Sequence, residues 1–125
     1  MTAIRPQPSP APAPTVSKAV VRAAALLGLS QAVLAEILGI SRATASRLVA
    51  GSYQLEPRRP KEWELALLFV RMFRSLDALV GHEDAARAWL RGPNQAFSRP
   101  PIDEVRTAEG LVRVVQYLDA VRGRV

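Results

Sequence analysis

Hydrophobic residues recur every three or four positions over almost the whole chain from residue 15 onward, which is the spacing of one helix face. Small and polar residues at intervals divide this pattern into segments. The first predicted helix runs from residue 15 to Leu27, with Ser17 as a candidate cap and Gly28 as its stop. The alternation of apolar and polar positions that is typical of strands does not occur. The sequence therefore predicts an all-α fold.

Two short helices are predicted next, joined by a tight turn. Ser30 caps a helix over residues 31–38 and Ser41 caps another over residues 42–50, because a serine oxygen accepts a hydrogen bond from a free amide of the first turn. Gly39 ends the first of these helices, since glycine adopts the left-handed conformation at little cost. With the first helix they form a compact N-terminal unit.

A boundary between two subdomains is placed near residues 52–60, where Pro57 and Pro60 forbid a continuous helix. The long helix predicted over residues 61–80 has one apolar face made of Leu65, Leu68, Phe69, Met72, Phe73, Leu76, Leu79 and Val80. A second apolar set follows its other side, comprising Trp63, Ala66, Leu67 and Val70. One core face needs an arc of roughly 100°. This helix is therefore expected to be buried on two sides, either against a partner chain or as the central helix of its own domain.

The C-terminal part is predicted to contain a short helix over residues 83–90, a loop over residues 92–101 and a last helix that Thr107 caps and that ends before Gly123. His82 is interpreted as a capping or surface residue. The chain is predicted to consist of a Pro-rich tail over residues 1–14 and two domains over residues 15–56 and 57–125. The tail is interpreted as disordered or polyproline-like, and the alternative is a docking peptide for a proline-binding groove.

Charge and composition restrict the classes of function that this sequence can have. The 125 residues hold 17 basic and 11 acidic side chains, and residues 1–60 carry a net charge of +5 (seven basic, two acidic) against +1 (ten basic, nine acidic) for the rest. A basic N-terminal half suits an acidic partner such as DNA. The sequence lacks cysteine and has one histidine, so we expect neither a metal site, a cofactor nor a catalytic centre. It also lacks an export signal or an apolar run of membrane-spanning length, which predicts a cytoplasmic protein.

Residues 31–50 carry the pattern of a helix-turn-helix, with small, turn and wedge residues at Gln31, Leu34, Ala35, Leu38, Gly39, Ile40, Ala45 and Leu48. The segment resembles the Xre/Cro-type helix-turn-helix, although Ala45 stands where that family usually has Val or Ile. Arg42 and Arg47 are predicted to read guanines from the second helix. The predicted DNA-binding residues are Gln31, Ser41, Arg42, Ala43, Thr44, Ser46 and Arg47. The alternative is a helical hairpin that binds no DNA.

A second set of motifs lies in order along residues 88–121: Trp89-Leu90, Pro93-Asn94, Ala96-Phe97, Pro101-Ile102-Asp103, and Thr107 with Gly110. This run resembles the toxin-binding domain of the Xre/MbcA/ParS antitoxins. Pro93 and Pro101 are expected to rigidify the loop, while Asn94 and Asp103 tie it through side-chain hydrogen bonds. Gly110 is expected to let two helices approach closely.

The resemblance implies a type II antitoxin that binds and silences a RES-domain toxin acting on NAD and represses the shared operon. Because one helix reads only one half-site, we expect the chain to bind DNA as a homodimer, and we also expect a higher toxin-antitoxin assembly. The toxin-binding residues that the resemblance implies are Trp89, Asn94, Phe97, Arg122, Gly123, Arg124 and Val125. The C-terminal residues would lie over the toxin's active site, although Arg122 and Arg124 are also what a helix dipole favours. The alternative function is a stand-alone dimeric transcriptional regulator whose C-terminal domain dimerises or senses a ligand. A small enzyme has little support.

Overall fold

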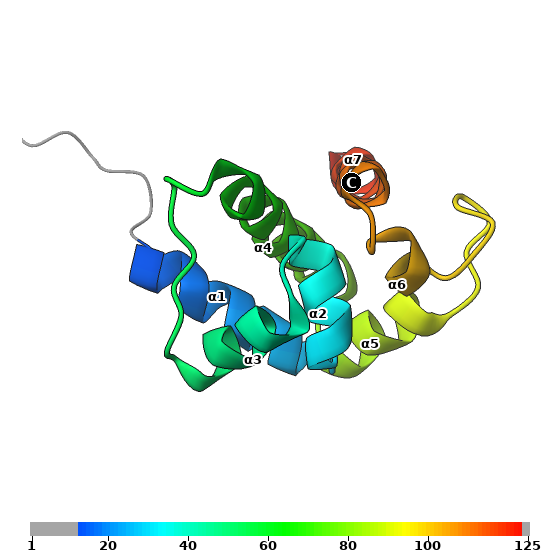
Figure 1. The fold of residues 1–125 in the computed structure, drawn as a ribbon. Helices are drawn as coiled ribbons and strands as arrows, with labels where there is room; N and C mark the ends of the chain where they lie inside the picture. Colours follow the sequence, from blue (N-terminus) through cyan, green and yellow to red (C-terminus); the bar gives the residue numbers. More distant parts are fainter. Residues whose placement is uncertain (1–12, 124–125) are drawn as a thin grey trace, which may run out of the picture.

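The computed structural model describes residues 13–123, and this part of the chain folds into helices with no strand, as predicted. Figure 1 shows their arrangement, with α4 running through the molecule. The helices are α1 (Ala13–Leu26), α2 (Gln31–Leu38), α3 (Arg42–Ala50), α4 (Pro60–Val80), α5 (Glu83–Arg91), α6 (Pro101–Glu104) and α7 (Ala108–Gly123). Most of the predicted tail, together with Arg124 and Val125, lies outside the described residues.

The start of α1 differs from the prediction. The helix begins at Ala13, and Pro14 occupies its first turn, where the missing N–H of proline removes no helical hydrogen bond. Ser17 is therefore not a cap. Its side chain is buried in the helix, and its Oγ accepts a hydrogen bond from the backbone N–H of Leu55 at 3.0 Å. The serine ties α1 to the segment between α3 and α4.

Helix α4 lies at the centre of the domain, in contact with α1, α2, α5 and α7. Phe69, Met72 and Leu76 are fully buried, and Trp63 and Ala66 on the second predicted face are buried as well. One hydrophobic cluster includes residues from the helices on both sides of residues 52–60. Packing within one chain thus accounts for most of the two-sided pattern, with Leu67 as the exception at 43% exposure.

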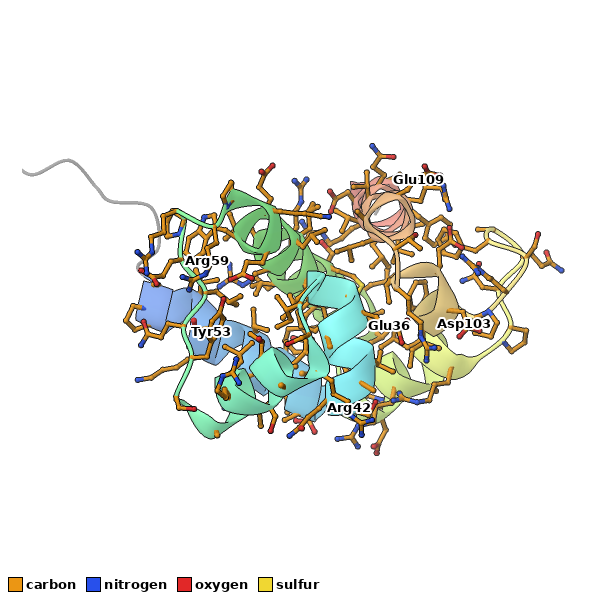
Figure 2. The ribbon with its side chains drawn as sticks, in the orientation of Figure 1. Glu36, Arg42, Tyr53, Arg59, Asp103 and Glu109 are labelled. Atoms are coloured by element: carbon orange, nitrogen blue, oxygen red, sulfur yellow. The ribbon has the colours of Figure 1, made fainter. Side chains whose placement is uncertain are left out.

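The connection between α3 and α4 is held by polar contacts at the start of α4. The Tyr53 hydroxyl donates to Glu62, and Arg59 Nε donates to the same carboxylate at 2.8 Å. The Arg59 guanidinium also lies over the Tyr53 ring, 4.9 Å from its centroid (Figure 2). Burial, with the hydrogen bond to Glu62, raises the pKa of Tyr53 above its ordinary value. Leu55 fills the core beneath.

Two further boundaries differ from the sequence prediction. The loop after α5 ends in the four-residue helix α6, which the sequence did not predict, and α7 continues through Gly123 instead of ending before it. Pro101 occupies the first turn of α6, where it stabilises a helix start. A helix this short has no periodic pattern of its own, so only its packing against α5 and α7 reveals it.

Candidate DNA-binding and toxin-binding surfaces

The helix-turn-helix of α2 and α3 has the caps that the sequence predicts. Ser30 Oγ accepts from Val33 N at 3.2 Å, and Ser41 Oγ accepts from Thr44 N at 3.0 Å. Gly39 has a left-handed φ of 67°, and its N–H bonds back to carbonyls of α2. These three local features fix the turn and set the start of α3.

The wedge between the two helices is formed as predicted. Leu34, Ala35, Leu38, Ala45 and Leu48 are buried, and Ile40 is half-buried against the same core. Ala35 and Ala45 leave room for the close contact between α2 and α3. The hydrophobic side of the motif is thus packed in the core, and its other side is free to face a partner.

The predicted reading residues lie on the outer side of α3. Arg42, Ala43, Ser46 and Arg47 are exposed, Thr44 is half-buried, and Gln31 is exposed in the first turn of α2. Figure 2 shows Arg42 at the edge of the molecule, pointing away from the core. Arg47 Nη2 donates to Thr44 Oγ1 at 3.1 Å, and Ser41 Oγ donates to the same oxygen at 2.8 Å. The outer side of α3 thus presents Arg42 from its first turn and Arg47 from its second half.

Three aromatic residues of α5, the loop that follows it and α7 form one cluster. Trp89 of α5 stacks on Tyr117 of α7 with 6.4 Å between ring centroids, and Phe97 of the loop meets the edge of Tyr117 at 5.3 Å. All three are half-buried, so each ring keeps part of its surface open to a partner. The cluster fixes the loop between α5 and α6 on the surface of α7.

Side-chain hydrogen bonds tie the same loop, but only one of the two predicted residues supplies them. Asn94 Oδ1 accepts from Ala96 N at 2.9 Å, as expected. Asp103 makes no side-chain hydrogen bond within the described residues, and its neighbour Glu104 takes that role. Figure 2 shows Asp103 on α6.

Glu104 is a buried carboxylate between two arginines. Arg99 of the loop donates to its Oε1 at 2.8 Å, and Arg113 of α7 donates to its Oε2 at 2.7 Å, while its side chain is only 4% exposed. The hydrogen bond from Arg99, reinforced by Arg113, holds the pKa of Glu104 below its ordinary value despite burial. A buried charge with two partners joins the loop, α6 and α7 into one surface.

Gly110 permits the junction of α6 and α7. A Cβ atom at this position would lie 1.8 Å from the carbonyl oxygen of Glu104, which no side chain tolerates. Thr107 Oγ1 accepts from Gly110 N at 3.0 Å and caps α7 as predicted. The expectation of a close helix approach at Gly110 is therefore confirmed.

Two arginines of α5, which the sequence analysis did not single out, bind the end of α1. Arg87 Nε donates to Leu26 O at 2.8 Å, and Arg91 donates to the carbonyls of Leu27 and Gly28 at 3.0 and 2.9 Å. These carbonyls have no helical partner, so the arginines cap α1 from a distant helix. Part of the basic charge of the C-terminal half is thus structural.

The other predicted residues lie at the ends of helices. Arg122 and Gly123 are exposed in the last turn of α7, beyond the half-buried Val121. His82 caps α5, its Nδ1 accepting from Ala85 N at 3.3 Å, which confirms that interpretation.

Over residues 13–123, no three His, Cys, Asp or Glu side chains are grouped as metal ligands would be. No helix in the same range is long and apolar enough to cross a bilayer.

Both halves of the chain match families of known proteins. Residues 6–71 match the antitoxin Xre-like helix-turn-helix domain, and residues 75–124 match the antitoxin Xre/MbcA/ParS C-terminal toxin-binding domain, so that the two matches meet inside α4. No curated protein gave a match. A chain of the crystal structure of the M. tuberculosis MbcT-MbcA toxin-antitoxin complex is 30% identical, with 88% of this chain and 96% of that chain covered and a TM-score of 0.62.

These matches span almost the whole sequence and agree with the two surfaces described above. The helix-turn-helix match includes the capped α2–α3 pair, and the toxin-binding match includes the aromatic cluster and the loop fixed by Glu104. The chain belongs to the Xre/MbcA/ParS antitoxins, with a helix-turn-helix in its N-terminal half and the family's toxin-binding domain in its C-terminal half.

Proposed function

We propose that this antitoxin neutralises a RES-domain toxin that consumes or transfers from NAD, and that it represses its own operon as a homodimer in the cytoplasm. The observation that carries the proposal is the joint presence of a capped, outward-facing α3 and a C-terminal surface with the family's toxin-binding motifs in order. An antitoxin acts by binding, so we assign it no catalytic residue and no cofactor.

The DNA-binding part rests on the outer row of α3. Arg42 and Arg47 are exposed, and neither forms an ion pair within the described residues. An exposed arginine that forms no ion pair can place its guanidinium on a guanine edge in the major groove. One such helix reads one half-site, and two half-sites lie about one helical turn apart. A dimer is therefore the form that we expect to bind the operator.

The toxin-binding part rests on the loop over residues 92–100 and the end of α7. Phe97 and Asn94 are already fixed in the free chain, so little conformational entropy is lost when a toxin binds them. The apolar face of α7 ends at Val121, which leaves Arg122 and Gly123 exposed beyond the core. We propose that residues 122–125 block the toxin's active site.

Removal of residues 122–125 tests this assignment. In cells that co-express the RES-domain protein of the same operon, the truncated chain is expected to remain bound to the toxin in a pull-down but to fail to preserve cellular NAD, because affinity and occlusion reside on different residues. Removal of residues 1–12 is the matched control and is expected to leave NAD preserved.

Three outcomes contradict parts of the proposal. A truncated chain that binds and still preserves NAD would move the blocking role to residues 91–103. A full-length chain that binds the toxin without preserving NAD would contradict neutralisation. A full-length chain that binds operator DNA but not this protein would favour the stand-alone regulator.

A further inference from the structure

One face of α4 is left uncovered by the other residues of the range 13–123. The exposed residues along it are Pro60, Glu64, Leu67, Arg71, Arg74 and Ala78, which we call the α4 stripe. They recur at intervals of four and three residues, the spacing with which one helix packs along another. Such a stripe on a central helix is a candidate interface.

The spacing of the α4 stripe is the same read in either direction. If a second α4 packs against it in the antiparallel sense, centred at residue 69, Leu67 of each copy faces Arg71 of the other, and Glu64 faces Arg74. Pro60 then faces Ala78 at both ends. The charges are complementary in this register, because each carboxylate meets a guanidinium and the two apolar ends meet each other.

Glu64 and Arg74, the two charged residues that pair in this register, form no ion pair within residues 13–123. Of the acidic residues within residues 13–123, only Glu64, Asp77 and Asp103 take part in no ion pair. Arg74 has neither an ion pair nor a side-chain hydrogen bond within the same residues. Arg71 is bound to Asp119 of α7, which holds its guanidinium to one side and leaves its aliphatic stem available for packing.

A hollow beside the stripe provides a place for an apolar side chain. It has a volume of about 390 Å³ and lies between the start of α1, the middle of α4 and the end of α7. Val16, Val70 and Leu67 contribute its apolar wall, and Arg71, Arg74 and Arg122 its polar rim. Leu67 is one of the most exposed large hydrophobic residues, so each copy offers both a projecting leucine and a hollow next to it.

We infer that the α4 stripe is the self-association surface of this antitoxin, and that its occupant is the α4 stripe of a second copy packed antiparallel. The inference rests on the proposed dimeric function and names the surface that would hold the two reading helices together. Because the apolar area is small and the ion pairs are exposed, the dimer is expected to dissociate on dilution and to weaken as salt is raised.

Charge reversal on the full-length chain tests the register. The expected result in sedimentation-equilibrium runs is a dimer of twice 13.6 kDa for the unmodified chain. Glu64→Arg and Arg74→Glu should each raise the dimer dissociation constant by about tenfold or more, because each places like charges opposite one another. The double variant Glu64→Arg/Arg74→Glu should restore association to within about threefold of the unmodified chain, since the pair is only exchanged.

Two further variants keep the test independent of folding. Leu67→Arg is expected to abolish the dimer, because it places a like charge opposite Arg71 of the other copy, and Val112→Arg, at an exposed valine of α7, is expected to leave it intact. Circular dichroism at the same concentrations checks that every variant retains its helix content.

The outcomes separate this inference from the proposed function. A dimer that all three α4 variants leave unchanged would overturn the α4 stripe and leave dimeric operator binding standing on another surface. Weakening by both single reversals without restoration in the double variant would overturn the antiparallel register. A monomer at every concentration, with and without operator DNA, would overturn the stripe and the dimer together, while neutralisation is measured separately with the toxin.

Discussion

Gly110→Ala adds one methyl group at the junction of α6 and α7, where the structure leaves no space for it. Gly110 is buried in the first turn of α7, and an added Cβ would lie 1.8 Å from Glu104 O, 2.8 Å from Glu104 C and 3.0 Å from Thr107 Oγ1. Ordinary contact begins at 3.4 Å. The Glu104 carbonyl therefore has to move by about 1.6 Å, which is 3.4 minus 1.8, and it is backbone that cannot rotate away.

The magnitude follows from three contributions. Overpacking of a rigid site costs about 1–3 kcal/mol, and the upper end applies because backbone has to shift. Loss of the Thr107 cap adds about 1 kcal/mol. The higher helix propensity of alanine offsets about 1 kcal/mol of this loss in stability. The net expectation is a loss of about 3 kcal/mol in the free energy of unfolding, which for a chain of this size lowers the melting temperature by roughly 10–15 °C.

Urea and thermal unfolding followed by circular dichroism measure this change on the full-length chain. Gly123→Ala is the matched control, because it lies in the same helix and nothing lies within 4 Å of its added Cβ. We expect that control to be neutral or slightly stabilising. If Gly110→Ala unfolds within about 0.5 kcal/mol of Gly123→Ala, a value typical of surface substitutions, the close approach of α6 to α7 is refuted.

Two arginine substitutions test the DNA-binding surface directly. Arg42→Ala and Arg47→Ala are each expected to weaken operator binding by about 1–3 kcal/mol in fluorescence anisotropy at fixed salt while toxin binding is retained, and unchanged affinity in both would remove them from the reading surface. Because the pKa of Glu104 is lower in the folded chain than its ordinary value of 4.5, its ionised form stabilises the fold above that pH, and this stability is lost as pH falls through the folded pKa. The free energy of unfolding of the unmodified chain should therefore fall more steeply below about pH 4.5 than that of Glu104→Gln, and equal slopes in acid titrations would show that the Arg99 and Arg113 contacts do not perturb this carboxyl.

Features whose hydrogen-bond partners lie within a few residues could be predicted from the sequence alone. Ser30, Ser41 and Thr107 cap helices through amides three positions ahead, and Gly39 needs only its own backbone conformation to end α2. The helix-turn-helix followed from such local chemistry, together with hydrophobic spacing that depends on one helix at a time. The motif order of the C-terminal half likewise resembles that of the family without reference to any tertiary contact.

Features whose partners lie far along the chain depend on how the helices pack and could not be predicted from the sequence. Ser17 has the form of a cap, but its oxygen meets Leu55, 38 residues away, and Arg87 caps α1 from a distance of 61 residues. Of two neighbouring acids, packing of α6 against α7 buried Glu104 between its arginines and left Asp103 without such a partner. Sequence spacing cannot distinguish these cases, because a polar side chain fits several local roles and only the packed neighbours select one.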